Sequence, residues 1–580
     1  MPKTKRNRAG QSREKMEWRH MDIHVHTPGS KDYQEPDASY LNILLKAEAE
    51  GLDILAFTDH NTVAGYSAMQ QEISDLRRWK TSGRLRPEER KRLEEYERLT
   101  GKILLLPGFE LTATFGFHIL AIFDKDTSIR TMEHTLLQLQ VPLEAIDAGE
   151  TEVGATIDVI TAYSVMAEAG ALVIAAHANS SHGVAMMGFR FGGQTRIAFT
   201  QDPNLHALEV TDLESHKRRT TASFFNGSRP QYPRRMHCIQ SSDAHRIRGN
   251  KNSLGVGERA TEVLLPEVSF KALKELFLGN DFTRTRPYRR TAAPFDHVTA
   301  ARKQGPTIVQ SFHETMTRQG GRMHAILRDV VAFANTNGGT IYVGLSPKLK
   351  APIKGVENPE AAMNELRKEV ERMVTPPLDV NLSVLKSGGK SVVRLIVPKG
   401  EDSPYVLEGS NIYLRQEAET SLAMRDEIVA LIKRSLPAKK PAISSKVEKP
   451  KKPRAVPVEQ PELETDLPRT GVEIVETSER KGVKYHTMCD LRNGGQVHNV
   501  THASARRLWR YAIALKEKGT FQANKVKWVG DLGLWHKYLR SGRSNYDLVQ
   551  KLPDGSFRIY YGVTEDGIHG PWRAVVGMED

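Results

Sequence analysis

The sequence predicts an α/β protein whose N-terminal block, residues 20–290, folds as a parallel sheet or barrel. Apolar segments of strand length, such as DILAFT at 53–58 and ALVIAA at 171–176, alternate with amphipathic helical segments such as 39–51. Each apolar segment also runs into polar residues, as in KILLLPGFEL and MHCIQSSDAH. Strands that alternate with helices favour a parallel arrangement, in which chemistry gathers at the carboxyl ends of the strands.

The helical elements of this block carry recognisable start and stop signals. The helix over 39–51 is expected to end at Gly51, because glycine readily adopts the left-handed conformation of a helix cap. Residues 77–99 predict a charged helical hairpin with Pro87 at the start of its second helix.

The glycine-rich segment 177–196 is interpreted as a lid over the site.

Composition and length bound the remaining organisation. The chain has 580 residues, which predicts two to four domains. We expect a second block at 296–436, a Pro- and Lys-rich linker at 437–468, and a small α+β domain at 469–580. The apolar runs are too short to span a bilayer, the basic leader lacks the apolar core of a signal peptide, and there are two cysteines. These features predict a cytoplasmic protein without a membrane partner.

Charge points to a polyanionic partner. Lys and Arg number 83 against 70 Asp and Glu, which gives a net charge of +13 and a pI near 9.4. Each phosphate that a protein neutralises releases counterions, so such an excess favours binding to DNA or RNA. A homo-oligomer or an accessory protein partner is left open by the sequence.

Potential metal ligands stand at the ends of successive predicted strands. They are His24, His26 and Asp32, then Asp59 and His60, then Glu110 and His118, then His177, and finally Asp243 and His245. Neutral imidazoles and carboxylates are the ligands that Zn, Mn and Fe prefer when several ions share a site. Their joint occurrence at strand ends therefore indicates a metal centre.

The ordered segments H-x-H, T-D-H, G-F-E-L, a downstream His, A-H and S-D-A-H resemble the PHP family, the polymerase and histidinol phosphatase superfamily, over about residues 20–290. The resemblance implies a distorted (β/α)7 barrel that holds two or three divalent metal ions (Mn, Zn or Fe) and hydrolyses phosphoesters. The ligands that it implies are His24, His26, His60, Glu110, His118, His177, Asp243 and His245. Asp32, displaced by one residue from the usual pattern, is a further candidate ligand, and Asp59 is interpreted as a residue that orients its neighbour.

A mechanism follows from this ligand set. Clustered divalent ions lower the pKa of a bound water and neutralise the charge that builds on phosphate oxygens. Histidines bind metals only when neutral, so we expect activity to be lost below about pH 6. Arg190 and Arg196 in the predicted lid, and Arg218 in ESHKRR, are candidate phosphate contacts, although basic loop residues are more commonly only solvated.

The second block is similar to the Schlafen/AlbA-like domain. The segments AFANTNGGTIYVGL at 332–345, VVRLIVPKG at 392–400 and NIYLRQEAET at 411–420 carry this similarity. It implies an α+β domain that binds nucleic acid. The family's acidic opening is replaced by Gln310, so we expect binding rather than cutting. Gly338 and Gly339 either approach a phosphate or form a tight turn.

The C-terminal block contains a predicted helix with a basic face. Arg506, Arg507 and Arg510 lie largely off its apolar side, so they either contact nucleic acid or form a solvated surface. The leading hypothesis for the whole chain is a metal-dependent nuclease. The alternatives are a small-molecule phosphatase, acting on a nucleotide or a bisphosphate, and a non-enzymatic nucleic-acid-binding protein.

Overall fold

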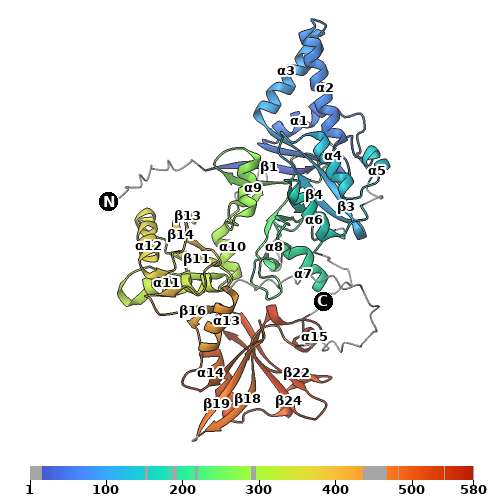
Figure 1. Cartoon of the computed structure of the whole chain (residues 1–580). Coiled ribbons are helices and arrows are strands. Elements are labelled where there is room, and N and C mark those ends of the chain that lie inside the picture. The colour runs from blue at the N-terminus through green and yellow to red at the C-terminus, as the bar shows by residue number, and fades with distance from the viewer. Residues whose placement is uncertain are drawn as a thin grey trace, which may run out of the picture. The chain divides into compact units, whose positions relative to one another are not determined.

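The computed structural model describes residues 16–150, 155–181, 183–185, 193–215, 220–288, 295–435, 467–480, 482–540 and 543–578. The chain divides into two compact units, one within residues 1–226 and 234–297, the other within 227–233 and 298–580 (Figure 1). The blocks predicted at 296–436 and 469–580 both fall in the second unit, except that residues 296 and 297 belong to the first unit. The predicted linker lies outside the described residues except for its last two positions.

The first unit is built on a nine-stranded sheet in the order β7-β6-β5-β4-β3-β2-β1-β8-β9. The strands are β1 (Glu17–Val25), β2 (Ile54–His60), β3 (Leu104–Ala113), β4 (Phe117–Ile122), β5 (Leu172–Ala175), β6 (Ala207–Glu209), β7 (His237–Ile239), β8 (Ala260–Leu265) and β9 (Thr285–Tyr288). The segment after β7 returns to β1, where Val25 forms a parallel bridge with Ala244. The backbone N–H of His26 donates to Ala244 O at 3.0 Å. The sheet is therefore a nearly closed barrel, and the predicted α/β barrel class is confirmed.

The sheet is not parallel throughout. Strand β4 runs antiparallel to both β3 and β5, and β8 and β9 continue the sheet antiparallel beyond β1. The reason for the reversal at β4 is the connection that precedes it. Only the short 3-10 turn η1 (Thr114–Gly116) joins β3 to β4, and a parallel crossover needs a dozen or more residues.

Helices cover the outside of this sheet. They are α1 (Tyr40–Ala49), α2 (Ala64–Thr81), α3 (Pro87–Lys102), α4 (Ile129–Gln138), α5 (Leu143–Ala148), α6 (Val159–Glu168), α7 (Gly193–Gln201), α8 (Thr221–Phe224) and α9 (Phe270–Leu278). Ser39 begins α1 by accepting the N–H of Asn42, and Gly51 follows it with φ of 74°. The predicted charged hairpin is α2 and α3, with Pro87 in the first turn of α3.

Alternation along the central strands produces two apolar cores. In β2, Leu55 and Phe57 pack with residues of α1, α2 and α3, whereas Ile54 and Ala56 belong to the core that includes α9. A strand buried on both faces reads as a continuous apolar run. This burial of both faces explains why the strands of the first unit are conspicuous in the sequence.

The second unit begins with a four-stranded sheet in the order β10-β11-β14-β13. Its elements are α10 (His297–Gln304), β10 (Gln310–His313), η2 (Gln319–Gly321), α11 (Arg322–Asn335), β11 (Gly339–Val343), α12 (Pro359–Met373), β12 (Val374–Thr375), β13 (Asn381–Ser387), β14 (Lys390–Val397), β15 (Val406–Leu407), β16 (Tyr413–Gln416), β17 (Glu419–Leu422) and α13 (Arg425–Ser435). Helix α11 packs on the sheet through a core that includes Leu327, Val331 and Ile341.

A seven-stranded antiparallel sheet completes the second unit, in the order β20-β19-β18-β24-β23-β22-β21. Its elements are β18 (Val472–Arg480), β19 (Val483–Asp490), β20 (Gly495–Val500), α14 (Arg507–Glu517), η3 (Ala523–Lys525), β21 (Lys527–Val529), β22 (Leu532–Arg540), β23 (Arg543–Lys551), β24 (Phe557–Thr564), η4 (Glu565–Gly567) and α15 (Trp572–Val576). Trp509 and Ile513 of α14 pack into the core of this sheet. None of the helices in the described part of the chain combines the length and apolarity needed to cross a membrane.

Candidate metal centre

Glu110 lies at the middle of a cluster of imidazoles from the first unit. Its Oε2 atom lies 3.3 Å from His24 Nε2, 3.4 Å from His26 Nε2 and 3.0 Å from His60 Nδ1. Its Oε1 atom lies 2.9 Å from His118 Nδ1 and 3.2 Å from His177 Nε2. The side chain of Glu110 is 1% exposed. One carboxylate from β3 thus contacts imidazoles carried by β1, β2, β4 and the turn after β5.

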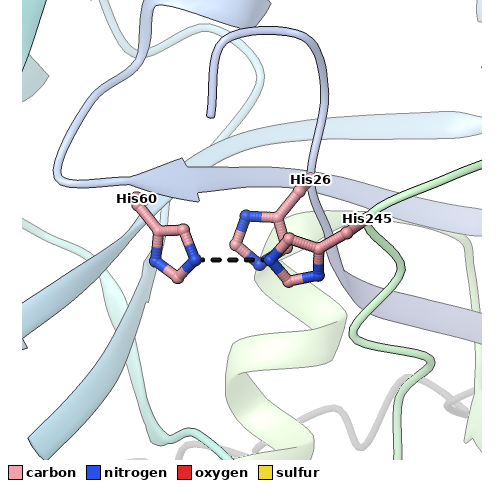
Figure 2. A group of neighbouring side chains, drawn as sticks. All are labelled: His26, His60 and His245. Carbon is pink, nitrogen blue, oxygen red and sulfur yellow. Dashed lines mark hydrogen bonds between the residues drawn. The ribbon is translucent and has the colours of Figure 1, made fainter. Parts of the chain in front are cut away.

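The segment after β7 closes the cluster from the other side. Asp243 Oδ1 lies 3.3 Å from His24 Nε2 and 3.5 Å from His26 Nε2. His245 Nε2 lies 3.3 Å from His60 Nε2 and 3.2 Å from Asp32 Oδ2. Figure 2 shows the rings of His26, His60 and His245 gathered together, with the contact between His60 and His245 dashed.

These residues fit divalent metal ions. Three groups have all their ligand atoms within 4.8 Å of one another: His26, His60 and His245; His24, His26 and Asp243; and His60, Glu110 and His118. His60 Nδ1 and Glu110 Oε2 are buried and have no hydrogen-bond partner in the described part of the chain. Nitrogen and carboxylate donors in overlapping groups are typical of sites that hold several ions. His177 and Asp32 touch the cluster but belong to none of the three groups.

The electrostatics of the cluster depend on Glu110. Burial alone raises the pKa of the Glu110 carboxyl, but the imidazoles of His118, His24 and His60 outweigh burial and hold that pKa well below its usual range. Burial lowers the pKa of His60, yet Glu110 and Asp32 raise it to about 9. Burial, followed by repulsion from His245 and His60, lowers the pKa of His26 to about 4. The imidazoles of the cluster therefore differ in their affinity for protons, and binding of a cation would displace some of those protons.

Backbone strain accompanies two of the clustered residues. His177 has φ of 26° and Asp243 has φ of 55°. Non-glycine residues seldom adopt this region, and they persist there when the surrounding structure determines the geometry. Asp243 is held by its backbone N–H, which donates to His24 O at 2.9 Å. A sharp turn at each strand end therefore directs these side chains into the cluster.

Asp59 lies behind the cluster. It accepts a hydrogen bond from the Thr27 N–H at 2.7 Å, from Thr27 Oγ1 at 2.7 Å and from Ser30 Oγ at 2.9 Å. Ser30 Oγ in turn lies 2.9 Å from His26 Nδ1. Asp59 is thus linked to His26 through the hydroxyl of Ser30.

The remaining predicted site residues are dispersed. Arg196 lies in α7, while Arg190 and Arg218, together with part of the predicted lid, fall outside the described residues. Gly338 has φ of 70°, and its N–H donates to Phe333 O at 2.9 Å, which is the geometry of a tight turn between α11 and β11. A Cβ on Gly339 would lie 2.7 Å from the Phe333 ring, so this glycine permits close packing.

The three arginines at α14 have different surroundings. Arg506 is 8% exposed and forms an ion pair with Glu427, so it contributes little to a solvated basic face. Arg507 is 76% exposed and lies 3.4 Å from Glu419. Arg510 donates to the backbone O of Ala505 at 3.1 Å. Arg507 and Arg510 are therefore the exposed members of the three.

Two buried carboxylates at the site were missed by the sequence reasoning. Glu209, the last residue of β6, lies 2.8 Å from His24 Nδ1 through its Oε2 atom. Asp22 of β1 accepts from Ser242 N–H at 3.0 Å and Ser242 Oγ at 2.6 Å, and so ties β1 to the turn that carries Asp243. The available signal for Glu209 was its place at the end of the short apolar segment HALE.

A family model for the Schlafen, AlbA_2 domain matches residues 310–424. The Schlafen/AlbA-like similarity predicted for the second block is confirmed for this segment. No curated protein matches the chain.

Solved structures show remote likeness. The lesion-specific endonuclease PfuEndoQ from Pyrococcus furiosus is 12% identical with a TM-score of 0.31, and the match covers 47% of this chain and 58% of that enzyme. A two-domain protein from Bacteroides vulgatus that contains a predicted PHP-like metal-dependent phosphoesterase is 15% identical with a TM-score of 0.29, covering 70% of this chain and 95% of that chain. The Endonuclease Q in a complex with a duplex bearing an abasic lesion is 12% identical with a TM-score of 0.29. The match covers 66% of this chain and 97% of that chain.

Proposed function

We propose that this protein is a metal-dependent hydrolase of phosphoesters and that its substrates are phosphodiester bonds of DNA or RNA. The observation that carries the proposal is the position of Glu110, whose two oxygens lie within 3.4 Å of five imidazoles. Imidazole nitrogens and a carboxylate gathered this closely are the ligand types that Zn, Mn and Fe prefer. Divalent ions bound there would neutralise the charge of a phosphate and make a water molecule more acidic.

The hydroxyls near the cluster support water as the nucleophile. Ser30 Oγ and Ser180 Oγ lie 2.9 Å from the Nδ1 atoms of His26 and His177, respectively. In both rings the other nitrogen, Nε2, faces Glu110. The two serines thus orient rings from behind and are turned away from the position where a substrate would meet the cluster.

Side-chain exposure favours one side of the cluster for the approach of a substrate. The side chains of His24 and His26 are fully buried, whereas those of Asp32 and Asp243 are 46% and 31% exposed. His245 lies between these two aspartates and is 17% exposed. A phosphoester would therefore reach the cluster along the edge formed by Asp32, His245 and Asp243.

Nucleic acid is favoured as the substrate by features outside the cluster. The chain carries a net charge of +13, and the strength of phosphate-backbone binding rises with the number of phosphates that are neutralised. Residues 310–424 match a Schlafen, AlbA_2 model, and resemblance to this domain type implies nucleic-acid binding. A small-molecule phosphatase would have little use for either feature.

The test is hydrolysis of end-labelled single- and double-stranded DNA and RNA as Mn²⁺ is titrated, with products separated by length. The full chain is compared with Asp243→Asn, which removes a charge from the cluster, and with Glu262→Gln. Glu262 is a matched control because it is also a buried carboxylate of the same sheet, 8% exposed, but contacts His20 and Arg286 instead of the cluster.

We expect wild type and Glu262→Gln to shorten a strand and Asp243→Asn to leave it intact. The ladder of products then distinguishes trimming from internal cleavage. Intact strands combined with release of phosphate from a nucleotide or a bisphosphate would replace the nuclease proposal with a small-molecule phosphatase. Equal hydrolysis by all three chains would show that the cluster around Glu110 does not catalyse the reaction.

A further inference from the structure

Glu209 occupies a position that connects two separate parts of the cluster. It is the last residue of β6, its side chain is 1% exposed, and its backbone pairs with Ile239 of β7. Its Oε2 atom lies 2.8 Å from His24 Nδ1 and accepts the backbone N–H of His177 at 2.9 Å. One carboxylate oxygen thus contacts β1 and the turn that follows β5.

The contact with His24 determines which nitrogen of that ring faces the cluster. An ionised carboxylate only accepts hydrogen bonds, so the Nδ1 atom of His24 must carry the proton in their contact. When the imidazole is neutral, Nε2 then keeps its lone pair. That Nε2 atom lies 3.3 Å from both Glu110 Oε2 and Asp243 Oδ1. Glu209 therefore directs the metal-binding form of His24 toward the cluster.

The contact with His177 is made to a strained segment. His177 has φ of 26°, and Glu209 holds this turn at two points. Its side chain accepts the His177 N–H, and its backbone O accepts the N–H of Ala178 at 2.7 Å. With the backbone fixed in this way, the His177 ring places Nε2 3.2 Å from Glu110 Oε1.

Glu209 itself contacts the ring of His24 from behind. It belongs to none of the groups of ligand atoms that gather within 4.8 Å. Its Oε1 atom is buried and has no hydrogen-bond partner in the described part of the chain. Carboxylates that contact the far nitrogen of a metal-binding histidine fix its orientation and increase its basicity, and their removal costs about 10- to 100-fold in metal affinity.

We infer that Glu209 is a positioning residue of the metal centre, which orients His24 through Nδ1 and His177 through its backbone. This inference rests on the proposed metal-dependent function. It assigns to β6, a strand for which no site residue was predicted, a part in assembling the cluster.

The experiment measures Mn²⁺ binding to the full chain by calorimetry for wild type, Glu209→Gln, Glu209→Ala and the matched control Glu262→Gln. Glutamine keeps an oxygen that accepts both hydrogen bonds but removes the negative charge, whereas alanine removes both contacts. We expect the affinity to fall about 10-fold in Glu209→Gln and about 100-fold in Glu209→Ala, with the number of bound ions unchanged. Glu262→Gln should bind as wild type does.

Two further measurements separate positioning from a merely structural role. The visible spectrum of the Co²⁺-loaded protein should change in Glu209→Ala and remain unchanged in Glu262→Gln, because only Glu209 orients ring nitrogens that face the cluster. Unfolding in urea with a chelator present reports stability without metal. A loss of affinity that is graded from Gln to Ala and accompanied by the spectral change supports the inference, even where stability also falls.

Other outcomes overturn it. Wild-type affinity in both Glu209 variants would show that His24 and His177 are oriented without this residue. Loss of one whole ion in Glu209→Gln, with the remaining ions bound as before, would make Glu209 a ligand instead. A wild-type chain that binds Mn²⁺ with the expected loss in the variants, yet hydrolyses no phosphoester, would refute the proposed function and leave the role of Glu209 supported. A wild-type chain that binds no divalent ion would overturn both.

Discussion

His60 Nδ1 lies 3.0 Å from Glu110 Oε2, and both atoms are buried without a hydrogen-bond partner in the described part of the chain. A buried polar atom that lacks a hydrogen bond costs about 1–3 kcal/mol. The two atoms form an ion pair with each other, but no hydrogen bond from the described residues satisfies either of them. A cation in contact with both would do so, and this relationship is the basis of the first two predictions.

Substitution of the central carboxylate should remove metal binding. In Glu110→Gln the surrounding imidazoles lose the negative charge that they share, so we expect Mn²⁺ affinity and hydrolysis to fall at least about 100-fold. Calorimetry and the end-label assay measure the two quantities. Glu262→Gln controls for the loss of a buried carboxylate from the same sheet, and normal Mn²⁺ affinity in Glu110→Gln would contradict the assignment of the centre.

Metal ions should stabilise the first unit. A ligand that binds only the folded chain at 100 times its dissociation constant raises the free energy of unfolding by about 2.7 kcal/mol. In scanning calorimetry the first unit should therefore unfold at a higher temperature with Mn²⁺ than with a chelator. The difference between these two unfolding temperatures should be smaller in Asp243→Asn. An identical midpoint with and without Mn²⁺ in wild type would count against a resident metal.

Asp59 should act mainly through stability. It accepts three hydrogen bonds from Thr27 and Ser30, and an asparagine at this position can accept on one side-chain atom only. We expect Asp59→Asn to lower the free energy of unfolding by about 1–3 kcal/mol in urea without metal. Mn²⁺ affinity should fall less than in Glu110→Gln, since Asp59 reaches His26 only through Ser30. A drop in affinity as large as that of Glu110→Gln would show a more direct role.

His206 should make the fold sensitive to acid. It is 5% exposed, and its Nδ1 atom accepts the N–H of Val173 at 2.8 Å. Burial, with the positive charges of Lys274 and Arg234, lowers its pKa to about 4, against about 6.5 in an unfolded chain. Between these values the unfolded chain binds a proton that the folded chain does not, so the free energy of unfolding falls as the pH drops from about 6.5 to about 4.

The variant His206→Asn isolates this contribution. The asparagine side chain offers an oxygen to Val173 N–H and does not titrate. We expect the stability advantage of wild type over the variant to shrink by about 1–3 kcal/mol between pH 7.5 and pH 4 in urea unfolding. The exposed His134 of α4 provides the control, and His134→Asn should leave the pH dependence of wild type unchanged. A constant difference between wild type and His206→Asn would contradict the prediction.

Arg507 should contact nucleic acid if α14 does. Its side chain is 76% exposed, whereas Arg506 is buried against Glu427. Arg507→Gln should weaken binding to single-stranded DNA or RNA and reduce the slope of log affinity against log salt by about 0.7. Arg425→Gln is a matched control, because Arg425 is 87% exposed on α13. Equal salt slopes in Arg507→Gln and wild type would place the contact elsewhere.

The sequence by itself determined the strand and helix pattern of the first unit. Buried strands such as β2 are apolar on both faces, so they stand out as continuous runs, and Gly51 and Pro87 mark helix ends through local backbone preferences that need no tertiary context. Polar residues at strand ends are equally local. The sequence therefore predicted that His24, His60, Glu110 and Asp243, which follow successive strands, gather at the carboxyl ends of the sheet.

Only the tertiary structure decided which atoms meet. The reversal of β4 follows from a three-residue turn, and the bridge between Val25 and Ala244 joins segments far apart in the chain. Glu209 touches His24 across 185 positions of sequence, so no local pattern distinguishes it from an ordinary acid at a strand end. The difference between Arg506 and Arg507 likewise depends on whether Glu427 packs beside the helix. Local chemistry fixes elements, whereas partners, burial and ring orientation depend on contacts between residues that the chain brings together only on folding.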